Sequence, residues 1–278
     1  IMANVIKIKK GLDINLKGKA SDVLLNGGKS DSYAIVPDHY NGIVPKVVAK
    51  VGEKVKAGSV LMIDKNRPEI KFVSPVSGEV TAVNRGEKRK VLSVVVKPEA
   101  QVEYEDFGKK NVASLKREEV KEAILQAGMW PFIKQRPYDI VASPADEPRD
   151  IFVSAFYSAP LAPNFDFIVK GQEADFQAGL DALAKLTDGK VYVGIRKGSS
   201  VSVKGVETVE VEGPHPAANV GVQINHIKPI NKGEVVWTVN PADVIIIGRL
   251  FNKGVADFGR LVVITGSETT ERGYIKTI

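Results

Sequence analysis

Short apolar stretches alternate with polar turns between residues 42 and 98, a pattern typical of consecutive β-strands. The region divides into two similar halves, each with a strand, a Gly-Glu-Lys turn and a second strand. The two turns are Gly52-Glu53-Lys54 and Gly86-Glu87-Lys88. The repeat predicts a compact β module of two related halves, whose boundaries we place at residues 41–100.

This organisation is typical of a lipoyl- or biotinyl-type barrel-sandwich module, which presents an acceptor lysine on a hairpin between its halves. Lys65 stands near the expected place. Asn66 and Arg67 follow it where carriers have small residues or Met, and the link from Lys65 to Ser74-Pro75 is longer than a carrier hairpin. We therefore expect an unmodified lipoyl-like β module, with a lipoyl- or biotin-type carrier as the alternative.

Helical periodicity begins after a polar connector that ends near residue 110. Ser114 is a suitable N-cap for a helix that Gly128 stops. The apolar stripe of this helix consists of Val120, Ala123, Ile124 and Ala127. Farther on, a strand at 151–156, a helix and a strand at 191–195 predict a βαβ unit, which implies a parallel sheet. The inner face of that helix consists of Phe176, Leu180, Leu183 and Ala184.

Further segments complete a predicted Rossmann-like α/β domain over residues 101–256. A strand is expected at 206–211, and the following Gly-Pro-His-Pro turn leads into a helix with Pro216 in its first turn. A strand at 235–239 then precedes a helix that Asn240 caps. The fold class is therefore α/β plus β.

The two ends of the chain lie outside these domains. Residues 1–40 contain short strands and turns and are interpreted as an N-terminal β extension. Strand-like sequence returns at 261–266 and 274–278 without further partners. We expect residues 257–278 to begin another domain that is truncated here.

The formal charge of +6 is unevenly distributed, because the first 100 residues hold 18 Lys and Arg against 10 Asp and Glu. Lysine commonly protects exposed strand edges; docking to an anionic membrane surface or an acidic partner is the alternative. The lysines occur on turns without interleaved aromatic residues, which argues against nucleic acid. No apolar run approaches the roughly 18 residues of a membrane span. Because the sequence lacks cysteine, disulfides and cysteine-bound metal sites are excluded within it.

Candidate chemistry is sparse. The turn after Phe156 holds prolines and alanines where a dinucleotide site needs glycines, so no nucleotide is expected there. The histidines are too far apart to predict a metal site. Trp130, Phe132 and Arg136 could line a site for a flat ring with carbonyl oxygens, and His215 stands at a predicted helix N-terminus that suits an anion or a carbonyl. The alternatives are an aromatic connector between domains and a histidine that caps the helix.

Four segments carry a resemblance to a known family: 71–78, 84–89, 213–217 and 245–251. With the order of the domains and the opening segment 6–13, they make the chain resemble the A subunit of the bacterial Na⁺-translocating NADH:quinone oxidoreductase over essentially its whole length. The resemblance implies a complex that passes electrons from NADH to ubiquinone and exports Na⁺.

The resemblance further implies a peripheral subunit on the cytoplasmic face of the bacterial inner membrane, bound to the other subunits. It would hold no covalent cofactor, with ubiquinone as a ligand of the complex. Its α/β domain would be related to the flavin subunit of respiratory complex I, without the nucleotide sites, and residues 257–278 would begin a truncated ubiquitin-like domain. We predict Trp130, Phe132, Arg136 and His215 as quinone contacts, and no catalytic or metal-binding residue.

The predicted role is therefore a subunit that contributes to quinone binding and complex assembly in NADH-driven ubiquinone reduction coupled to Na⁺ export. The isolated chain is not expected to be catalytic, because it holds no group that accepts a hydride or a single electron. One alternative is the corresponding subunit of a ferredoxin:NAD⁺ oxidoreductase, which shares both layers and holds iron–sulfur clusters on cysteines in its C-terminal part. The carrier module is the other.

Overall fold

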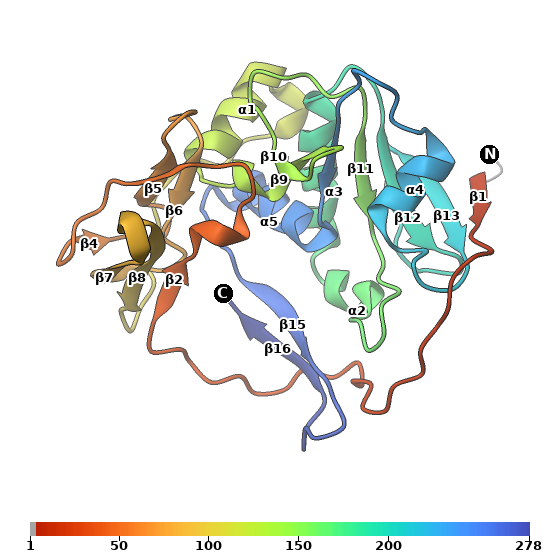
Figure 1. Cartoon of the computed structure of the whole chain (residues 1–278), viewed down its shortest axis with the longest axis horizontal. Helices are drawn as coiled ribbons and strands as arrows, with labels where there is room; N and C mark the ends of the chain where they lie inside the picture. Colours follow the sequence, from red (N-terminus) through yellow and green to blue (C-terminus); the bar gives the residue numbers. More distant parts are fainter. Residues whose placement is uncertain (1–3) are drawn as a thin grey trace. The chain divides into compact units, whose positions relative to one another are not determined.

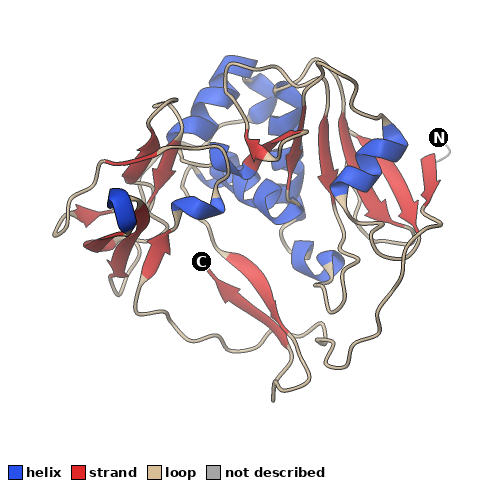
Figure 2. Ribbon diagram, in the orientation of Figure 1, coloured by secondary structure: helices blue, strands red, loops and turns tan. Residues whose placement is uncertain are grey.

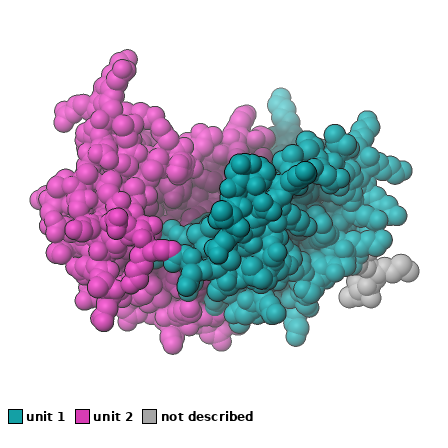
Figure 3. All heavy atoms as spheres, turned by 90° about the horizontal axis from the view of Figure 1, so that it is seen from below, with its two compact units in different colours: residues 1–27, 147–248, 259–278 teal, residues 28–146, 249–258 magenta. Residues whose placement is uncertain are grey.

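The computed structural model describes residues 4–278, which form two compact units (Figure 3). Unit 1 contains the described residues up to 27, together with 147–248 and 259–278. Unit 2 contains 28–146 and 249–258. Both units are therefore discontinuous in sequence, which the hydrophobic pattern alone did not indicate.

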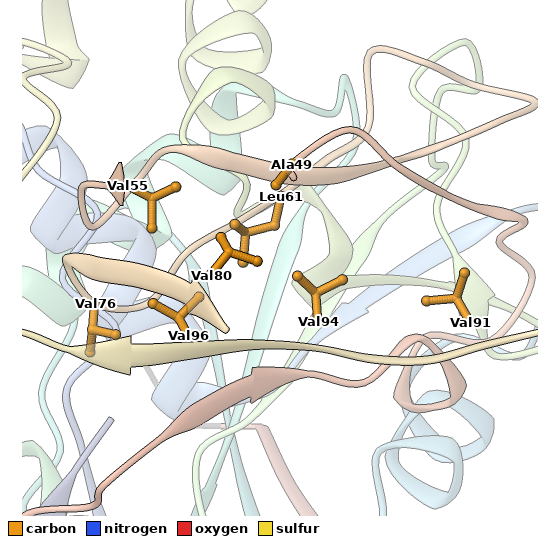
Figure 4. Close-up of a cluster of buried hydrophobic side chains, with 8 residues drawn as sticks. All are labelled: Ala49, Val55, Leu61, Val76, Val80, Val91, Val94 and Val96. Atoms are coloured by element: carbon orange, nitrogen blue, oxygen red, sulfur yellow. The ribbon is translucent and has the colours of Figure 1, made fainter. Parts of the chain in front are cut away.

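Two small antiparallel sheets form the β module inside unit 2 (Figure 1), and they include residues 33–35, which the sequence pattern placed in the N-terminal extension. The four-stranded sheet has the order β2 (Tyr33–Ile35), β8 (Val91–Pro98), β7 (Gly78–Arg85) and β4 (Lys54–Val55). The three-stranded sheet has the order β3 (Pro45–Val47), β5 (Val60–Asp64) and β6 (Lys71–Val73). Alternate strand residues enter one core between the sheets, as expected for half-buried strands. Figure 4 shows this core, which comprises Ala49, Val55, Leu61, Val76, Val80, Val91, Val94 and Val96.

The rest of unit 2 holds helix α1 (Arg117–Gln126) and the antiparallel pair β9 (Ile133–Arg136) and β10 (Ile140–Val141). The predicted cap was wrong: Ser114 belongs to a short 3-10 turn and donates to Asn111 O at 2.9 Å. The helix begins three residues later, where the Lys116 N–H donates to the Glu119 carboxylate at 2.8 Å. Gly128, with φ +67°, follows the helix as predicted.

Parallel strands form the sheet of unit 1 (Figures 1 and 2). Within this unit the order is β1 (Asn4–Lys7), β13 (Glu207–Glu212), β12 (Val191–Arg196), β11 (Ile151–Ser154) and β14 (Val236–Val239). Between β11 and β12 the chain forms α2 (Phe165–Val169) and α3 (Glu173–Lys185). The predicted βαβ unit is confirmed, except that Ala182 rather than Ala184 completes the buried face of α3.

The next two helices test the remaining boundary predictions. Helix α4 (Val220–Ile227) begins four residues after Pro216, so the prediction of Pro216 in its first turn was wrong. Backbone bonds from Ala217 N to Pro214 O and from Asn219 N to Pro216 O close two turns there instead. The prediction for α5 (Pro241–Lys253) is confirmed, since Asn240 Oδ1 accepts from the Ala242 N–H at 3.0 Å.

Within unit 1 the N-terminal segment pairs with the C-terminal hairpin. Antiparallel strands β15 (Arg260–Ile264) and β16 (Gly273–Thr277) form the hairpin that the sequence predicted as two strands. Leu24 bridges Tyr274, whose hydroxyl accepts from the Asn164 N–H at 2.6 Å and whose ring contacts Phe167. None of the helices in residues 4–278 has the length and apolar composition that crossing a bilayer requires.

Candidate functional site

A cleft of about 930 Å³ lies at the carboxyl ends of β11 and β12 in unit 1. Three segments line it: the N-terminal segment around Asp13–Asp22, the loop after β11 and the turn after β12. In parallel sheets this edge is the usual place for a ligand, because the loops that leave the strands diverge there. The parallel order of the strands therefore positions the cleft, and the loop sequences determine its chemistry.

Ser158 connects this cleft to His215. The Ser158 hydroxyl accepts from the Ala218 N–H at 3.0 Å and lies 3.0 Å from His215 Nδ1. Since the hydroxyl already accepts one hydrogen bond, it can donate its own proton to Nδ1, which leaves the imidazole proton on Nε2. The predicted alternative, a histidine that caps a helix, was wrong, because α4 starts at Val220 and the His215 ring contacts Ser158.

The main chain of His215 is held by the N-terminal segment. Its N–H donates to Asp13 Oδ1 at 2.8 Å, and its carbonyl accepts from the Leu12 N–H at 2.9 Å. Gly11 lies so close that a Cβ there would stand 2.1 Å from the same carbonyl oxygen. A glycine is thus required for this approach, and the N-terminal segment fixes one border of the cleft.

Tyr157 links the ends of two strands. Its hydroxyl donates to Asn240 Oδ1 at 3.3 Å, which joins the loop after β11 to the residue after β14. Burial, followed by the nearby Asp243 carboxylate, raises the pKa of Tyr157 to about 12. The phenol therefore remains protonated and can act as a hydrogen-bond donor throughout the physiological range.

Arg196, the last residue of β12, contacts the same loop. Its Nη2 donates to the Tyr157 carbonyl at 3.2 Å, and its guanidinium lies 5.7 Å from the centre of the Phe156 ring. The side chain is exposed and retains donors that can face the cleft.

Asp166 holds the turn after β12. Its Oδ1 accepts from Ser199 Oγ at 2.9 Å, from Ser200 Oγ at 2.7 Å and from the Ser200 N–H. Burial alone would raise the pKa of this carboxyl, but the hydrogen bonds from Ser200 and Ser199 outweigh it and lower the pKa. Asp13 and Asp22 are likewise engaged, with the His215 N–H and the Asn164 amide. The three acids of the lining therefore stabilise the walls of the cleft.

The predicted aromatic contacts lie in unit 2. Trp130 is fully buried, and its indole N–H donates to the Ala142 carbonyl at 2.8 Å. Phe132 packs edge-to-face with Phe258 at a centroid distance of 6.0 Å, and Arg136 Nε lies 3.2 Å from the Asp139 carboxylate. These three residues, neighbours in sequence, lie in one segment of unit 2, in which Trp130 belongs to the core, whereas His215 lies in unit 1.

The hairpin that would carry a cofactor in a lipoyl module is held in place by hydrogen bonds in this chain. Buried Asp64 accepts from Arg67 Nε at 2.8 Å. Arg67 then donates to the Val141 carbonyl at 3.1 Å and to the Gly42 carbonyl at 3.0 Å. Lys65 is exposed, but its N–H donates to Val44 O at 2.7 Å. The hairpin is therefore bound on both sides, unlike a freely projecting carrier hairpin.

The sequence patterns did not single out Tyr157, Ser158 and Asp166. The first two directly follow the predicted strand at 151–156, a position that in a parallel sheet indicates a ligand-facing side chain. Their partners Asn240 and His215 lie 83 and 57 residues away. No local pattern connects such pairs, so only the position after the strand could have identified these residues.

Two family models match the chain. One, described as the NqrA N-terminal barrel-sandwich hybrid domain, matches residues 6–99, and the other, described as the NqrA second alpha/beta domain, matches residues 115–256. These matches confirm the predicted combination of a barrel-sandwich module with an α/β domain.

Curated relatives are similar over almost the whole chain. The A subunit of the Na(+)-translocating NADH-quinone reductase of Neisseria meningitidis serogroup A is 36% identical over 279 residues, which cover 99% of this chain and 62% of the relative. The proteins of the same name from Hahella chejuensis and Vibrio atlanticus are each 37% identical over 278 residues, 98% of this chain and 62% of the relative. The chain therefore spans about three fifths of the length of these relatives.

A solved structure of an NAD⁺-reducing [NiFe]-hydrogenase in the air-oxidized state is also similar, with a TM-score of 0.37 and 12% identity over 64% of this chain and 42% of that one.

Proposed function

The chain belongs to the family of the A subunits of the Na(+)-translocating NADH-quinone reductases, and from this premise we propose that it is a peripheral subunit of such a complex. In this role it binds the other subunits on the cytoplasmic face of the membrane and contributes a quinone contact. The observation that carries the proposal is the match of both domains, in order, at 36% identity over 99% of the chain.

The proposed α/β domain is Rossmann-like, with strand order β13-β12-β11-β14 and no nucleotide. A nucleotide phosphate needs glycine where the first strand meets its helix, so that the backbone can approach it. Here the loop after β11 contains Ala159, Pro160, Ala162 and Pro163. We also propose that the β15–β16 hairpin begins a ubiquitin-like domain. The proposed subunit holds no covalent cofactor.

For the quinone contact we keep the residues that the sequence predicted as two separate candidates, Trp130, Phe132 and Arg136 in unit 2 and His215 in unit 1. Arg136 and His215 can donate hydrogen bonds to carbonyl oxygens, and both are only half-buried. Trp130 lies in the same segment as Arg136, so its fluorescence can report on a ring bound there. A quinone needs an apolar wall and one or two donors. In unit 2 the half-buried Phe132 and Arg136 can supply them, whereas His215 is a candidate donor in unit 1.

A short-chain ubiquinone titrated into the Trp237→Phe chain tests the contact, because Trp130 is then the only tryptophan. We expect saturable quenching. Replacing Arg136 by Met should raise the apparent Kd about fivefold, the effect of losing a hydrogen bond worth about 1 kcal/mol. Lys50→Gln, an exposed substitution in the same unit as Arg136, serves as the control. Linear quenching without saturation would contradict the quinone contact.

Membership of the complex is tested separately. The tagged chain should copurify with the other subunits from the membranes of its host. If it copurifies but does not bind quinone, the proposed assembly role is supported and the proposed quinone contact is contradicted. If the chain is recovered alone, the proposed assembly role is wrong.

A further inference from the structure

The tip of the β7–β8 hairpin is the most basic exposed turn of unit 2. Residues 84–90 are Asn-Arg-Gly-Glu-Lys-Arg-Lys, with four cations and one acid, and every charged residue of the turn is exposed. Both flanking strands are eight residues long and pair with each other. The hairpin, whose pairing shifts register between Val80 and Ala82 and again between Asn84 and Arg85, therefore presents a concentrated positive charge to solvent.

The backbone of this turn is unusual for the residues that occupy it. Lys88 has φ +50° and Arg89 has φ +63°, so two consecutive residues with long side chains adopt the left-handed conformation. Glycine or asparagine is normally found there, because a Cβ crowds the following carbonyl. Backbone strain that a simpler residue would relieve indicates that these side chains serve another purpose.

The turn is also closed by its own hydrogen bonds. Gly86 N donates to Lys90 O at 2.9 Å, and Arg85 donates to Arg89 O at 3.1 Å. Lys90 forms an ion pair with Asp38 at 2.6 Å. By contrast, the charged ends of Lys88 and Arg89 have no hydrogen-bond or ion-pair partner among residues 4–278. Two free cations thus project from a fixed backbone.

We propose that this turn, residues 84–90, is a contact site for an anionic phospholipid surface. Each lysine or arginine near such a surface strengthens binding about fivefold, and a surface of many phosphates needs no matching shape. Leu92, 43% exposed, lies beside the turn and packs close to Gly86, which adds an apolar side chain suited to the headgroup region.

Other partners fit the turn less well. It contains no Phe, Tyr or Trp on which a base could stack, which disfavours nucleic acid. An acidic protein would need a shaped surface that pairs with each cation, and the turn offers two flexible side chains instead. The inference goes beyond the proposed subunit role, because it assigns the chain a lipid contact of its own.

Sedimentation with vesicles tests the proposal. At low salt the 278-residue chain should bind vesicles of equal phosphatidylglycerol and phosphatidylcholine and should not bind pure phosphatidylcholine. Replacing both free cations, Lys88→Asn and Arg89→Asn, should lower the partition coefficient about 25-fold. Because asparagine tolerates the left-handed conformation, the Tm of this variant should stay equal or rise.

A matched control distinguishes the effect of the position of the charges from the effect of the net charge. Lys50→Asn with Lys65→Asn removes the same two charges from exposed positions outside the turn and should retain binding. The proposal is overturned if the wild-type chain does not distinguish the two vesicles, if the turn variant binds like the wild type, or if the control loses as much. Loss of copurifying subunits in the turn variant, with no vesicle binding by the wild type, would assign the turn to an acidic partner instead.

Discussion

At the scale of single residues, the most consequential buried charge is Asp150, immediately before β11. The residue is 1% exposed, and its carboxylate accepts from Arg149 Nε and Lys228 Nζ, both at 2.7 Å, and from the Lys190 N–H at 3.1 Å. Arg149 continues the network to the Lys228 and Pro229 carbonyls and to Glu234. These contacts fix the amino ends of β11, β12 and β14 relative to one another.

Asp150→Asn should destabilise unit 1 by about 2 kcal/mol, because the buried side chain then loses its charge-assisted hydrogen bonds from half-buried Arg149 and exposed Lys228. Burial opposes ionisation of Asp150, but the hydrogen bonds from Lys228, Lys190 and Arg149 lower its pKa. The folded state therefore binds fewer protons than the unfolded state. This stabilisation is fully present above the unfolded carboxyl pKa of about 3.9 and is lost as the pH falls through the folded pKa.

Urea unfolding at pH 7 and at pH 3 measures both effects. The stability difference between wild type and Asp150→Asn should shrink at the lower pH, because pH 3 lies below the unfolded carboxyl pKa of about 3.9 and the unfolded wild type then gains a proton. Exposed Asp31→Asn should change neither value. A difference that stays constant with pH would show that the carboxylate charge is not what stabilises the fold.

At the scale of elements, α3 and α5 pack closely where each helix has a glycine. A Cβ on Gly179 would stand 2.0 Å from Val244 O, and a Cβ on Gly248 would stand 1.7 Å from Asp175 O. Both helices therefore need a residue without a side chain at the crossing. The hydrophobic pattern predicted both helices but gave no sign of how closely they approach.

Gly179→Ala should reduce the free energy of unfolding by about 3 kcal/mol, since the methyl group forces two backbones apart. Gly221→Ala is the matched control, because Gly221 lies in α4 and a methyl group added to it would have no other atom within 4 Å. There alanine should stabilise by up to about 1 kcal/mol through helix propensity. Chemical denaturation of both variants measures their free energies of unfolding. Equal reductions of this free energy in the two variants would contradict the close crossing.

At the scale of the whole molecule, unit 2 depends on a segment from late in the sequence. Phe107 N donates to Gly254 O at 2.8 Å, and Lys110 N donates to Phe251 O at 3.0 Å. Phe258 contacts Phe132 in the same unit. The connector after the β module is therefore anchored by residues about 145 positions farther along the chain.

Two truncated chains test this dependence. A chain of residues 1–258 keeps the anchoring segment, and a chain of 1–248 lacks it. Hydrogen exchange at the Phe107 and Lys110 amides should be about fivefold faster in the shorter chain, as expected for the loss of a bond worth about 1 kcal/mol. The longer chain should exchange like the full one at these positions. Equal protection in both truncated chains would show that the anchor is dispensable.

The hydrophobic pattern predicted the periodic features of this protein. The β module and the βαβ unit were correct because strands of period two and helices of period 3.6 repeat locally. The Asn240 cap was correct because a cap acts on the next two or three residues. The positions of Ser114, Pro216 and Ala184 were wrong, because helix ends depend on which turn closes first and on neighbouring packing. The predicted quinone contacts remain a prediction. No sequence pattern identified the cleft residues Tyr157, Ser158 and Asp166.

The sequence by itself thus determined the type and order of the elements, the lack of glycines after β11 and the basic turn of the β module. Only the tertiary structure decided which distant residues meet. Tyr157 reaches Asn240 because β11 and β14 are neighbours in the sheet, and Arg67 ties its hairpin to Val141 because unit 2 folds those segments together. The physical reason is that periodicity records which side of an element is buried, whereas strand order and loop closure decide what it is buried against.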